Sequence, residues 1–132
     1  GSERVCVTTQ RKEINKDEYS VIGLKIMNII DPPQNQPAIN FEIRITPPNG
    51  PPTGLLGYNK NNQPIVKAPD FDGLIVVPDE RSIDLEKYEE RNLGFAVQVP
   101  KNAPSGTYIL NVEVKANGAI YPPVHKVYIE VT

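Results

Sequence analysis

The sequence predicts an all-β protein, an antiparallel β-sandwich, on three observations. First, segments such as Ile39–Thr46 alternate apolar and polar residues at every position, which is the two-residue period of a strand with one buried face. Second, the 132 residues include 14 prolines, and a proline inside a helix costs about 3 kcal/mol. Third, strands do not alternate with helices along the chain, so two half-apolar sheets must cover each other.

About seven to eight strands are expected, and each is bounded by turn-forming residues. In the longest early segment the alternation places Ile22, Leu24 and Ile26 on the buried face. The clearest segments are Val5–Thr9, Tyr19–Ile29, Ile39–Thr46, Leu74–Val77, Phe95–Val99, Thr107–Ala116 and Lys126–Val131.

For one further segment, the sequence is compatible with either one short helix or a strand. Asp79 suits the N-cap position of a helix over residues 79–92. Ile83 and Leu85 fit the spacing of a strand equally well, and they do not complete a helical stripe. The sequence supports both structures at this point.

The turn before the penultimate strand carries a recognisable motif. Residues 99–110 read Val-Pro-Lys-Asn-Ala-Pro-Ser-Gly-Thr-Tyr-Ile-Leu, in which Pro100 and Pro104 end one strand and Gly106 permits a sharp turn. This motif, within the segment Leu93–Val131, resembles the Val-Pro-x-x-Ala-Pro-x-Gly-x-Tyr-x-Leu pattern of immunoglobulin-like domains in bacterial and archaeal cell-surface proteins.

The resemblance implies an immunoglobulin-like β-sandwich with a tyrosine corner at Tyr108. In that arrangement the ring enters the core and the hydroxyl bonds back to the preceding turn. The inward position two residues further on is Leu110 instead of the cysteine of antibody domains. Because the chain has no tryptophan, Phe41 is expected to fill the core position of the third strand. Tyr108, Gly106 and Phe41 are thus expected to be structural residues.

The chain is expected to form a single domain, since its length suits one hydrophobic core. Gly1 and Ser2 are typical of what remains when a purification tag is removed, which leaves 3–132 as one immunoglobulin-like domain. The only methionine is Met27, so the native chain is expected to continue upstream into a signal peptide, a membrane anchor or a neighbouring domain. Contact with a membrane is expected only through such a removed N-terminal segment.

Charge and composition exclude several classes of function. The net charge of −2 lacks the basic footprint of a nucleic-acid-binding protein. No apolar run approaches the ~20 residues of a membrane-spanning helix. His125 is the only histidine and Cys6 the only cysteine, too few for a zinc site, and Cys6 is expected to be a small hydrophobic residue and not a nucleophile. Without a phosphate-binding loop or a nucleophile elbow, the sequence predicts no catalytic residue, no cofactor and no enzyme.

An acidic segment resembles half of a calcium-binding loop. Asp70 and Asp72 precede Gly73, and further carboxylates follow nearby. A calcium ion takes six or more oxygen ligands, whereas an Asp-Gly turn explains the same residues without an ion. We therefore predict no metal requirement, with Asp70 and Asp72 as the calcium candidates. The wider segment 70–91 has eight acidic and three basic residues, a local net charge of −5, and is interpreted as solvated surface.

The segment 47–63 is the longest connection between expected strands, and it is rich in proline, glycine and asparagine. Connections of this length are often functional. Leu55, Leu56 and Tyr58 could form an exposed apolar surface that binds a partner. Alternatively, the two leucines tuck under the sandwich as a lid or a further strand.

The function expected from these features is non-catalytic and extracytoplasmic. The domain is expected to bind another cell-surface protein or itself, or to be a structural module of a surface assembly, such as an accessory subunit of a surface filament or a domain that docks on an S-layer. An exposed edge strand is the expected contact, at Val5–Thr9 or Val124–Val131.

The alternative is a carbohydrate-binding or spacer domain of a secreted polysaccharide-degrading enzyme. Sugar-binding surfaces present exposed aromatic rings on a flat face. A coplanar set formed by Tyr58, Tyr88, Tyr121 and Tyr128 would favour this alternative, whereas scattered tyrosines favour protein contacts.

Overall fold

The computed structural model describes residues 5–132, and every regular element in this range is a β-strand. Residues Gly1 and Ser2, interpreted above as the remnant of a tag, lie outside the described residues. A search of the described part of the chain for a helix long and apolar enough to span a membrane finds none.

The described residues form twelve strands. They are β1 (Val5–Val7), β2 (Arg11–Glu13), β3 (Tyr19–Met27), β4 (Ile39–Thr46), β5 (Leu55–Tyr58), β6 (Pro64–Val66), β7 (Ile75–Val77), β8 (Glu80–Leu85), β9 (Glu90–Gln98), β10 (Gly106–Ala116), β11 (Ala119–Ile120) and β12 (His125–Val131).

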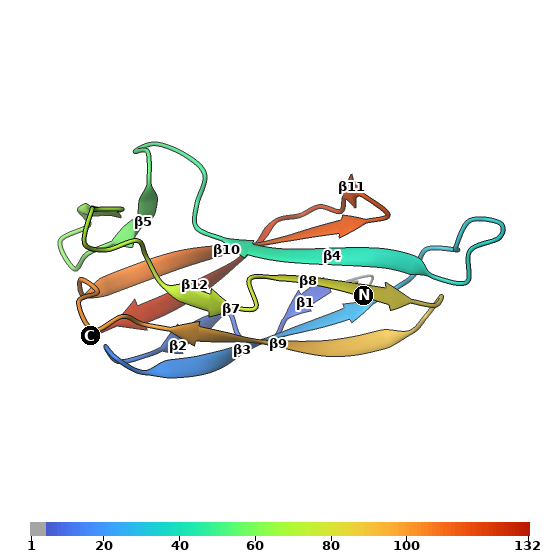
Figure 1. Ribbon diagram of the computed structural model, residues 1–132, viewed down its shortest axis with the longest axis horizontal. Helices are drawn as coiled ribbons and strands as arrows, with labels where there is room; N and C mark the ends of the chain where they lie inside the picture. The colour runs from blue at the N-terminus through green and yellow to red at the C-terminus, as the bar shows by residue number, and fades with distance from the viewer. Residues whose placement is uncertain (1–4) are drawn as a thin grey trace.

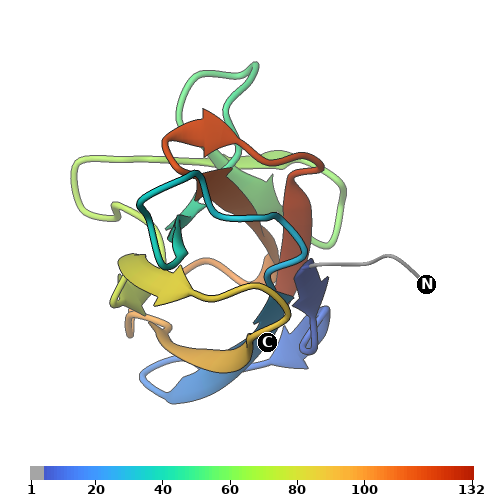
Figure 2. The same cartoon turned by 90° about the vertical axis from the view of Figure 1, so that its right-hand side faces the viewer.

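The strands form two sheets that face each other, as the side and end views show (Figure 1; Figure 2). Sheet A has four strands in the order β1-β3-β9-β7. Sheet B has the main order β2-β12-β10-β4-β8, with β11 and the β5–β6 hairpin joined to β10. All strand pairs are antiparallel except β2 and β12, which are parallel. The predicted all-β antiparallel sandwich is confirmed.

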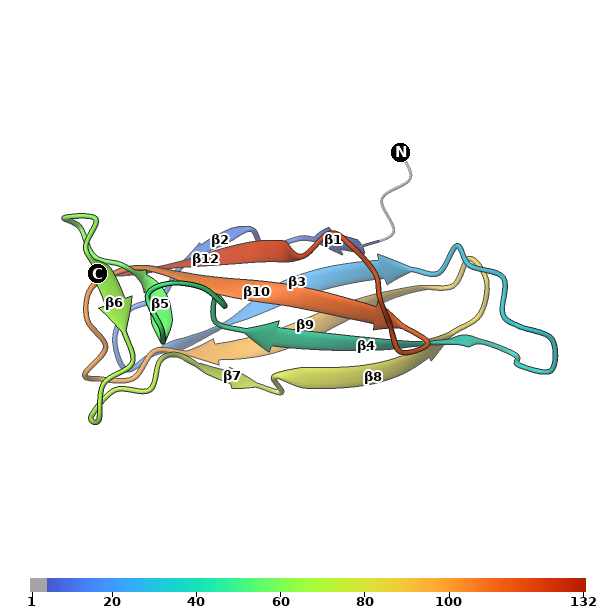
Figure 3. The ribbon, with the colours of Figure 1, turned by 90° about the horizontal axis from the view of Figure 1, so that it is seen from above.

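The chain crosses from one sheet to the other along both long sides of the sandwich. On one side it leaves sheet A after β1 and joins sheet B as β2. On the opposite side it leaves sheet A after β7 and joins sheet B as β8. Seen from above, β1 and β2 lie along one long side of the molecule and β7 and β8 along the other (Figure 3).

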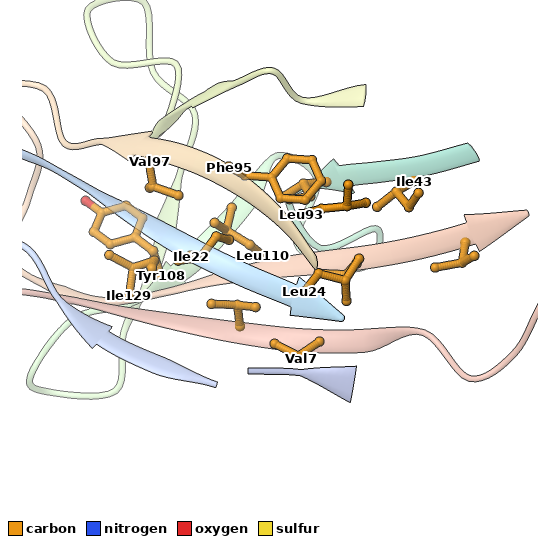
Figure 4. Packing of buried hydrophobic residues seen from close by; sticks show 14 of the residues in the cluster. Val7, Ile22, Leu24, Ile43, Leu93, Phe95, Val97, Tyr108, Leu110 and Ile129 are labelled. Carbon is orange, nitrogen blue, oxygen red and sulfur yellow. The ribbon is translucent and has the colours of Figure 1, made fainter. Parts of the chain in front are cut away.

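The core lies between the sheets and takes inward residues from both. Along β3 and β9 alternate residues are buried, which is the pattern that the sequence predicts for a strand with one face in the core. Phe95, Tyr108 and Ile43 are among the largest fully buried side chains, and Figure 4 shows them packed with residues of both sheets. Phe41 is 1% exposed and occupies the core position expected of it.

The segment Asp79–Asn92 forms strands, so the helical alternative is wrong. Its first part is β8, in which Ile83 pairs with Phe41 and Leu85 with Ile39 across to β4. Its second part is a turn that leads into β9. Two core positions at strand spacing therefore outweigh the N-cap signal at Asp79.

The turn between β8 and β9 is organised by Asn28, a buried polar residue whose role the sequence does not reveal. Its side-chain amide donates a hydrogen bond to the Leu85 carbonyl at 3.0 Å, and its Oδ1 accepts one from the Ile30 amide at 2.7 Å. Its carbonyl accepts a hydrogen bond from the amide of Tyr88, a residue with a φ of 66°. A buried side chain with both polar atoms bonded fixes the turn.

Candidate interaction surface

Tyr108 has the burial and the hydrogen bond of a tyrosine corner. Its side chain is 1% exposed, and its hydroxyl donates to the Pro104 carbonyl at 2.5 Å. The ring meets Phe71 edge to face with centroids 6.1 Å apart. Burial raises the pKa of Tyr108 to about 12, since the phenolate would be poorly solvated there. Tyr108 is therefore a structural residue at one end of the core, because its ring is buried and its hydroxyl is already hydrogen-bonded.

Strand β5 crosses the start of β10 at very close range, and two glycines make this possible. Tyr58 pairs with Thr107 and Gly57 with Tyr108. A Cβ at Gly57 would overlap the Thr107 carbonyl oxygen, and a Cβ at Gly106 would overlap the Tyr58 carbonyl oxygen. Gly106 also has a φ of 151°, a conformation that favours glycine. This close approach holds the 47–63 connection against the end of the sandwich.

The same crossing decides between the two interpretations of the 47–63 connection. Leu55 and Leu56 are 6% and 3% exposed. Tyr58 is half-buried. The two leucines therefore lie inside as part of a further strand, and the expectation of an exposed contact surface at Leu55 and Leu56 is corrected. Sequence alternation could not find this position, because β5 buries consecutive residues.

The acidic calcium candidates lie in a loop that protein contacts already hold. Phe71, between the two aspartates, is 7% exposed and packs on the tyrosine corner. The Asp70 carbonyl accepts a hydrogen bond from the Asn102 side chain at 2.6 Å. The Asp72 carboxylate lies 3.8 Å from the Lys67 ammonium. Within residues 5–132, no three His, Cys, Asp or Glu side chains gather in a way that could hold a metal ion.

The single cysteine and histidine lie on different strands. Cys6 is a free cysteine that is exposed on β1. Successive residues of a strand point to opposite faces, so Cys6 points outward because Val5 and Val7 on either side face the core. His125 begins β12 opposite Val112 and is half-buried.

The outer face of sheet A carries a contiguous group of exposed apolar side chains. The exposed fractions are 71% for Tyr19, 55% for Val21, 47% for Ile75 and 60% for Val77. Strand pairing joins them, because Ala96 of β9 pairs with both Val21 and Val77. We call this group the sheet A patch: Tyr19, Val21, Ile75, Val77 and Ala96.

The sheet A patch carries no charged residue. The only polar residue in its two rows is Gln98, which pairs with Tyr19 and Ile75. The next row consists of Gly23 paired with Gly94, which adds no side chain. A contiguous, uncharged apolar surface is the kind of patch that marks an interaction site on soluble proteins.

The outer face of sheet B has the opposite character. A shallow depression there is lined by Glu42, Arg44, Glu80, Glu113 and Lys115, all charged. The two outer faces therefore differ in chemistry at these positions. The other exposed large apolar side chains of residues 5–132 lie outside the strands of sheet A, at Val66, Tyr88, Ile120 and Val124.

The end strands of the two main strand orders differ in the same way. The main order of sheet B ends at β2, with the sequence Arg-Lys-Glu, and at β8, with three charged residues among six. Charged side chains protect an edge from pairing with another chain. The edges of sheet A are β1, Val-Cys-Val, and β7, Ile-Val-Val, which carry no charge. The expected edge at Val5–Thr9 is confirmed, whereas Val124–Val131 is wrong because β12 lies between β2 and β10.

Each uncharged edge has a groove beside it. Beside β7, a cavity of about 170 Å³ between the sheets is lined by Val76, Leu74, Ile45, Leu56 and Leu110, with Asp72 and Asp79 also on its wall. Beside β1, a groove of about 470 Å³ is lined on the sheet B side by His125 and Lys126.

The sequence contained part of the signal for the sheet A patch. With Ile22, Leu24 and Ile26 inward, Tyr19 and Val21 had to face outward. What the sequence could not reveal is that Ile75 and Val77 lie two strands away on the same face, since that depends on the sheet order.

The comparisons with known proteins identify the fold. No family model and no curated protein matches this sequence. A family 123 glycoside hydrolase from Clostridium perfringens superposes with a TM-score of 0.58 and 11% identity over 94% of this chain. The chain spans only 23% of that hydrolase. The ASH/PapD-like domain of human CEP192 superposes with a TM-score of 0.57 and 12% identity, covering 98% of this chain and 85% of that domain. The protein thus has a PapD-like, immunoglobulin-like β-sandwich fold.

Proposed function

We propose that this domain is a non-catalytic protein-interaction module of a cell-surface assembly, located outside the cytoplasm, and that it binds through the sheet A patch. The observation that carries the proposal is the patch itself: four large apolar side chains at 47–71% exposure on one neutral sheet face. Exposing these side chains to water is unfavourable by roughly 25 cal/mol per Å², so covering them is a source of binding energy.

The size of the patch indicates what kind of complex it supports. A stable protein complex buries about 800 Å² on each partner. Such a contact involves about 20–30 residues on each side, whereas the sheet A patch has five residues, so the edge strand β7 takes part in the proposed contact. A partner that uses both features gains apolar burial from the face and hydrogen bonds from the unpaired edge.

The carbohydrate-binding alternative has less support. Tyr58 lies in β5, Tyr88 in the turn before β9, Tyr121 after β11 and Tyr128 in β12. Tyr121 meets Phe41 edge to face, so its ring packs on the core. Four tyrosines on four separate elements do not form the flat aromatic platform on which sugars stack.

The location outside the cytoplasm is tested with Cys6, which is exposed. Intact cells that make the full-length protein are treated with a membrane-impermeant maleimide. Labelling equal to that after cell lysis is expected, with a Cys6→Ser variant as the unlabelled control. Labelling that appears only after lysis would contradict this location.

The binding face is tested with a photoreactive residue in the full-length protein in the same cells. Placed at Val77, in the patch, it is expected to give discrete protein adducts on illumination. The control position is Glu113 on the charged face of sheet B, which should give few. Equal adducts at the two positions, or none at Val77, would contradict the proposed surface.

A further inference from the structure

Resting on the proposed function, we propose that the partner at this surface is a second copy of this chain, joined head to tail. Strand β7 of one copy pairs with β1 of the next, so that the two copies share one continuous sheet A. Because β1 and β7 are opposite edges of the sheet, each added copy offers a new free edge. Such a heterologous contact builds chains of copies instead of a closed dimer.

The topology of sheet A permits this contact without turning the molecule over. Neighbouring strands in the order β1-β3-β9-β7 are all antiparallel, so β7 runs opposite to β1. A second copy placed beside β7 in the same orientation therefore presents its β1 in the antiparallel direction. The outer faces of the two sheets then coincide, and the sheet A patches lie along one surface.

The charges around the two edges are complementary. Strand β7 is preceded by Asp72, which lies 3.8 Å from the Lys67 ammonium, and is followed by Asp79 and Glu80. The groove beside β1 is lined by Lys126 and by Arg11, whose guanidinium also pairs with Glu130 of the same chain. In the antiparallel pair, the residues that follow β1 lie beside those that precede β7, which brings the basic side to Asp72.

The same charges disfavour a two-fold contact between two β7 strands. In that contact Asp72 of one copy would lie near Asp79 of the other at both ends. Like charges facing each other across strands are destabilising. The acidic residues around β7 thus favour a basic partner edge over an identical one.

The side-chain pattern allows two registers. Inward residues must oppose inward residues, so Val76 lies opposite either Val7 or Val5. With Val7, the outward Cys6 lies opposite Val77. With Val5, Cys6 lies opposite Ile75. In both registers the natural cysteine meets an exposed apolar residue of β7, which supplies a direct test.

The test introduces one cysteine in β7, as Val77→Cys or Ile75→Cys, in the otherwise natural chain. Cβ atoms of directly opposed residues lie close enough for a disulfide. Under a mild oxidant, at least one variant is expected to give a ladder of dimers, trimers and higher species on a non-reducing gel. The ladder should disappear when Cys6→Ser is added to the same variant. The control is Tyr88→Cys, an exposed site in the β8–β9 turn.

The outcomes separate this inference from the proposed function. Dimers that persist after Cys6→Ser would show β7 against β7, and overturn the head-to-tail contact. Crosslinking no stronger than in the Tyr88→Cys control would overturn it as well. If the photoreactive residue at Val77 still gave adducts with a different protein, the proposed function would stand with a foreign partner. Thermal melts of each variant check that the fold is intact.

Discussion

Tyr108 connects the turn, the core and the crossing strand at a single residue. Its hydroxyl bonds to Pro104, its ring packs on Phe71, and its backbone pairs with Gly57. A residue with this many roles contributes to stability through both its hydroxyl and its ring. The two contributions can be measured separately.

We expect Tyr108→Phe to lower the free energy of unfolding by about 0.5–1.5 kcal/mol, because the hydroxyl loses a hydrogen bond at a buried site. Tyr108→Ala removes the whole ring and should cost about 3–5 kcal/mol. Urea denaturation measures both values. Tyr88→Phe, at a residue that is 66% exposed, is the control. If neither Tyr108 variant changed the free energy of unfolding, the tyrosine corner would be refuted.

The raised pKa of Tyr108 predicts a loss of stability at high pH. Burial raises the pKa of the folded state from 10.0 to about 12, so the folded protein holds the phenolic proton more tightly than the unfolded chain. The resulting stabilisation is complete below pH 10 and is lost as the pH rises from 10 to 12. The wild type should therefore lose more stability over this range than Tyr108→Phe. Parallel curves for the two proteins would contradict the prediction.

The contact between β5 and β10 depends on the absence of a side chain on each strand. Both Gly57 and Gly106 face a carbonyl oxygen of the other strand where a Cβ would stand. Neither strand can move away freely, since β5 buries Leu55 and Leu56. The added volume must then be accommodated by shifting backbone.

Gly57→Ala and Gly106→Ala are each expected to lower the free energy of unfolding by about 1–3 kcal/mol, as overpacking of a tight contact does. Gly50→Ala is the matched control, because no atom lies within 4 Å of the Cβ it would add. Chemical denaturation compares the three. Equal stability of all three would mean that the strands separate without cost.

The loop around Phe71 should keep its structure without calcium. Its ring, the Asn102–Asp70 hydrogen bond and the Lys67–Asp72 ion pair hold it by protein contacts. We expect the melting temperature to be the same in chelator and in millimolar calcium. A rise in calcium that vanishes in Asp70→Asn and Asp72→Asn would reverse this, since a ligand of the folded state stabilises by mass action.

The whole molecule is joined across its two sheets along both long sides, where β1 continues into β2 and β7 into β8. One sheet therefore cannot detach without pulling a strand from the other. We expect a single cooperative transition, with tyrosine fluorescence and far-ultraviolet circular dichroism coinciding during denaturation. Two separate transitions would mean that the sheets unfold independently.

The sequence predicted the layers of this fold better than its edges. Alternation placed Ile39–Thr46 and the core face of β3 correctly, because the face to which a strand residue points is set by its local sequence position. It could not reveal that β12 has β2 beside it, or that Val21 and Val77 share a face, because both depend on the order of strands. Consecutive buried residues such as Leu55 and Leu56 also escape a two-residue period.

The parallel pairing of β2 with β12 has a mechanical consequence. Arg11 pairs with Tyr128, Lys12 with Ile129 and Glu13 with Glu130, so both strands run the same way. Tension applied to the chain ahead of β2 and behind β12 therefore pulls these strands past each other along their length. The hydrogen bonds between them share the load at once instead of opening one after another. A domain held between two anchors in this way resists rupture in shear, and its lifetime under force is governed by the rate of unfolding.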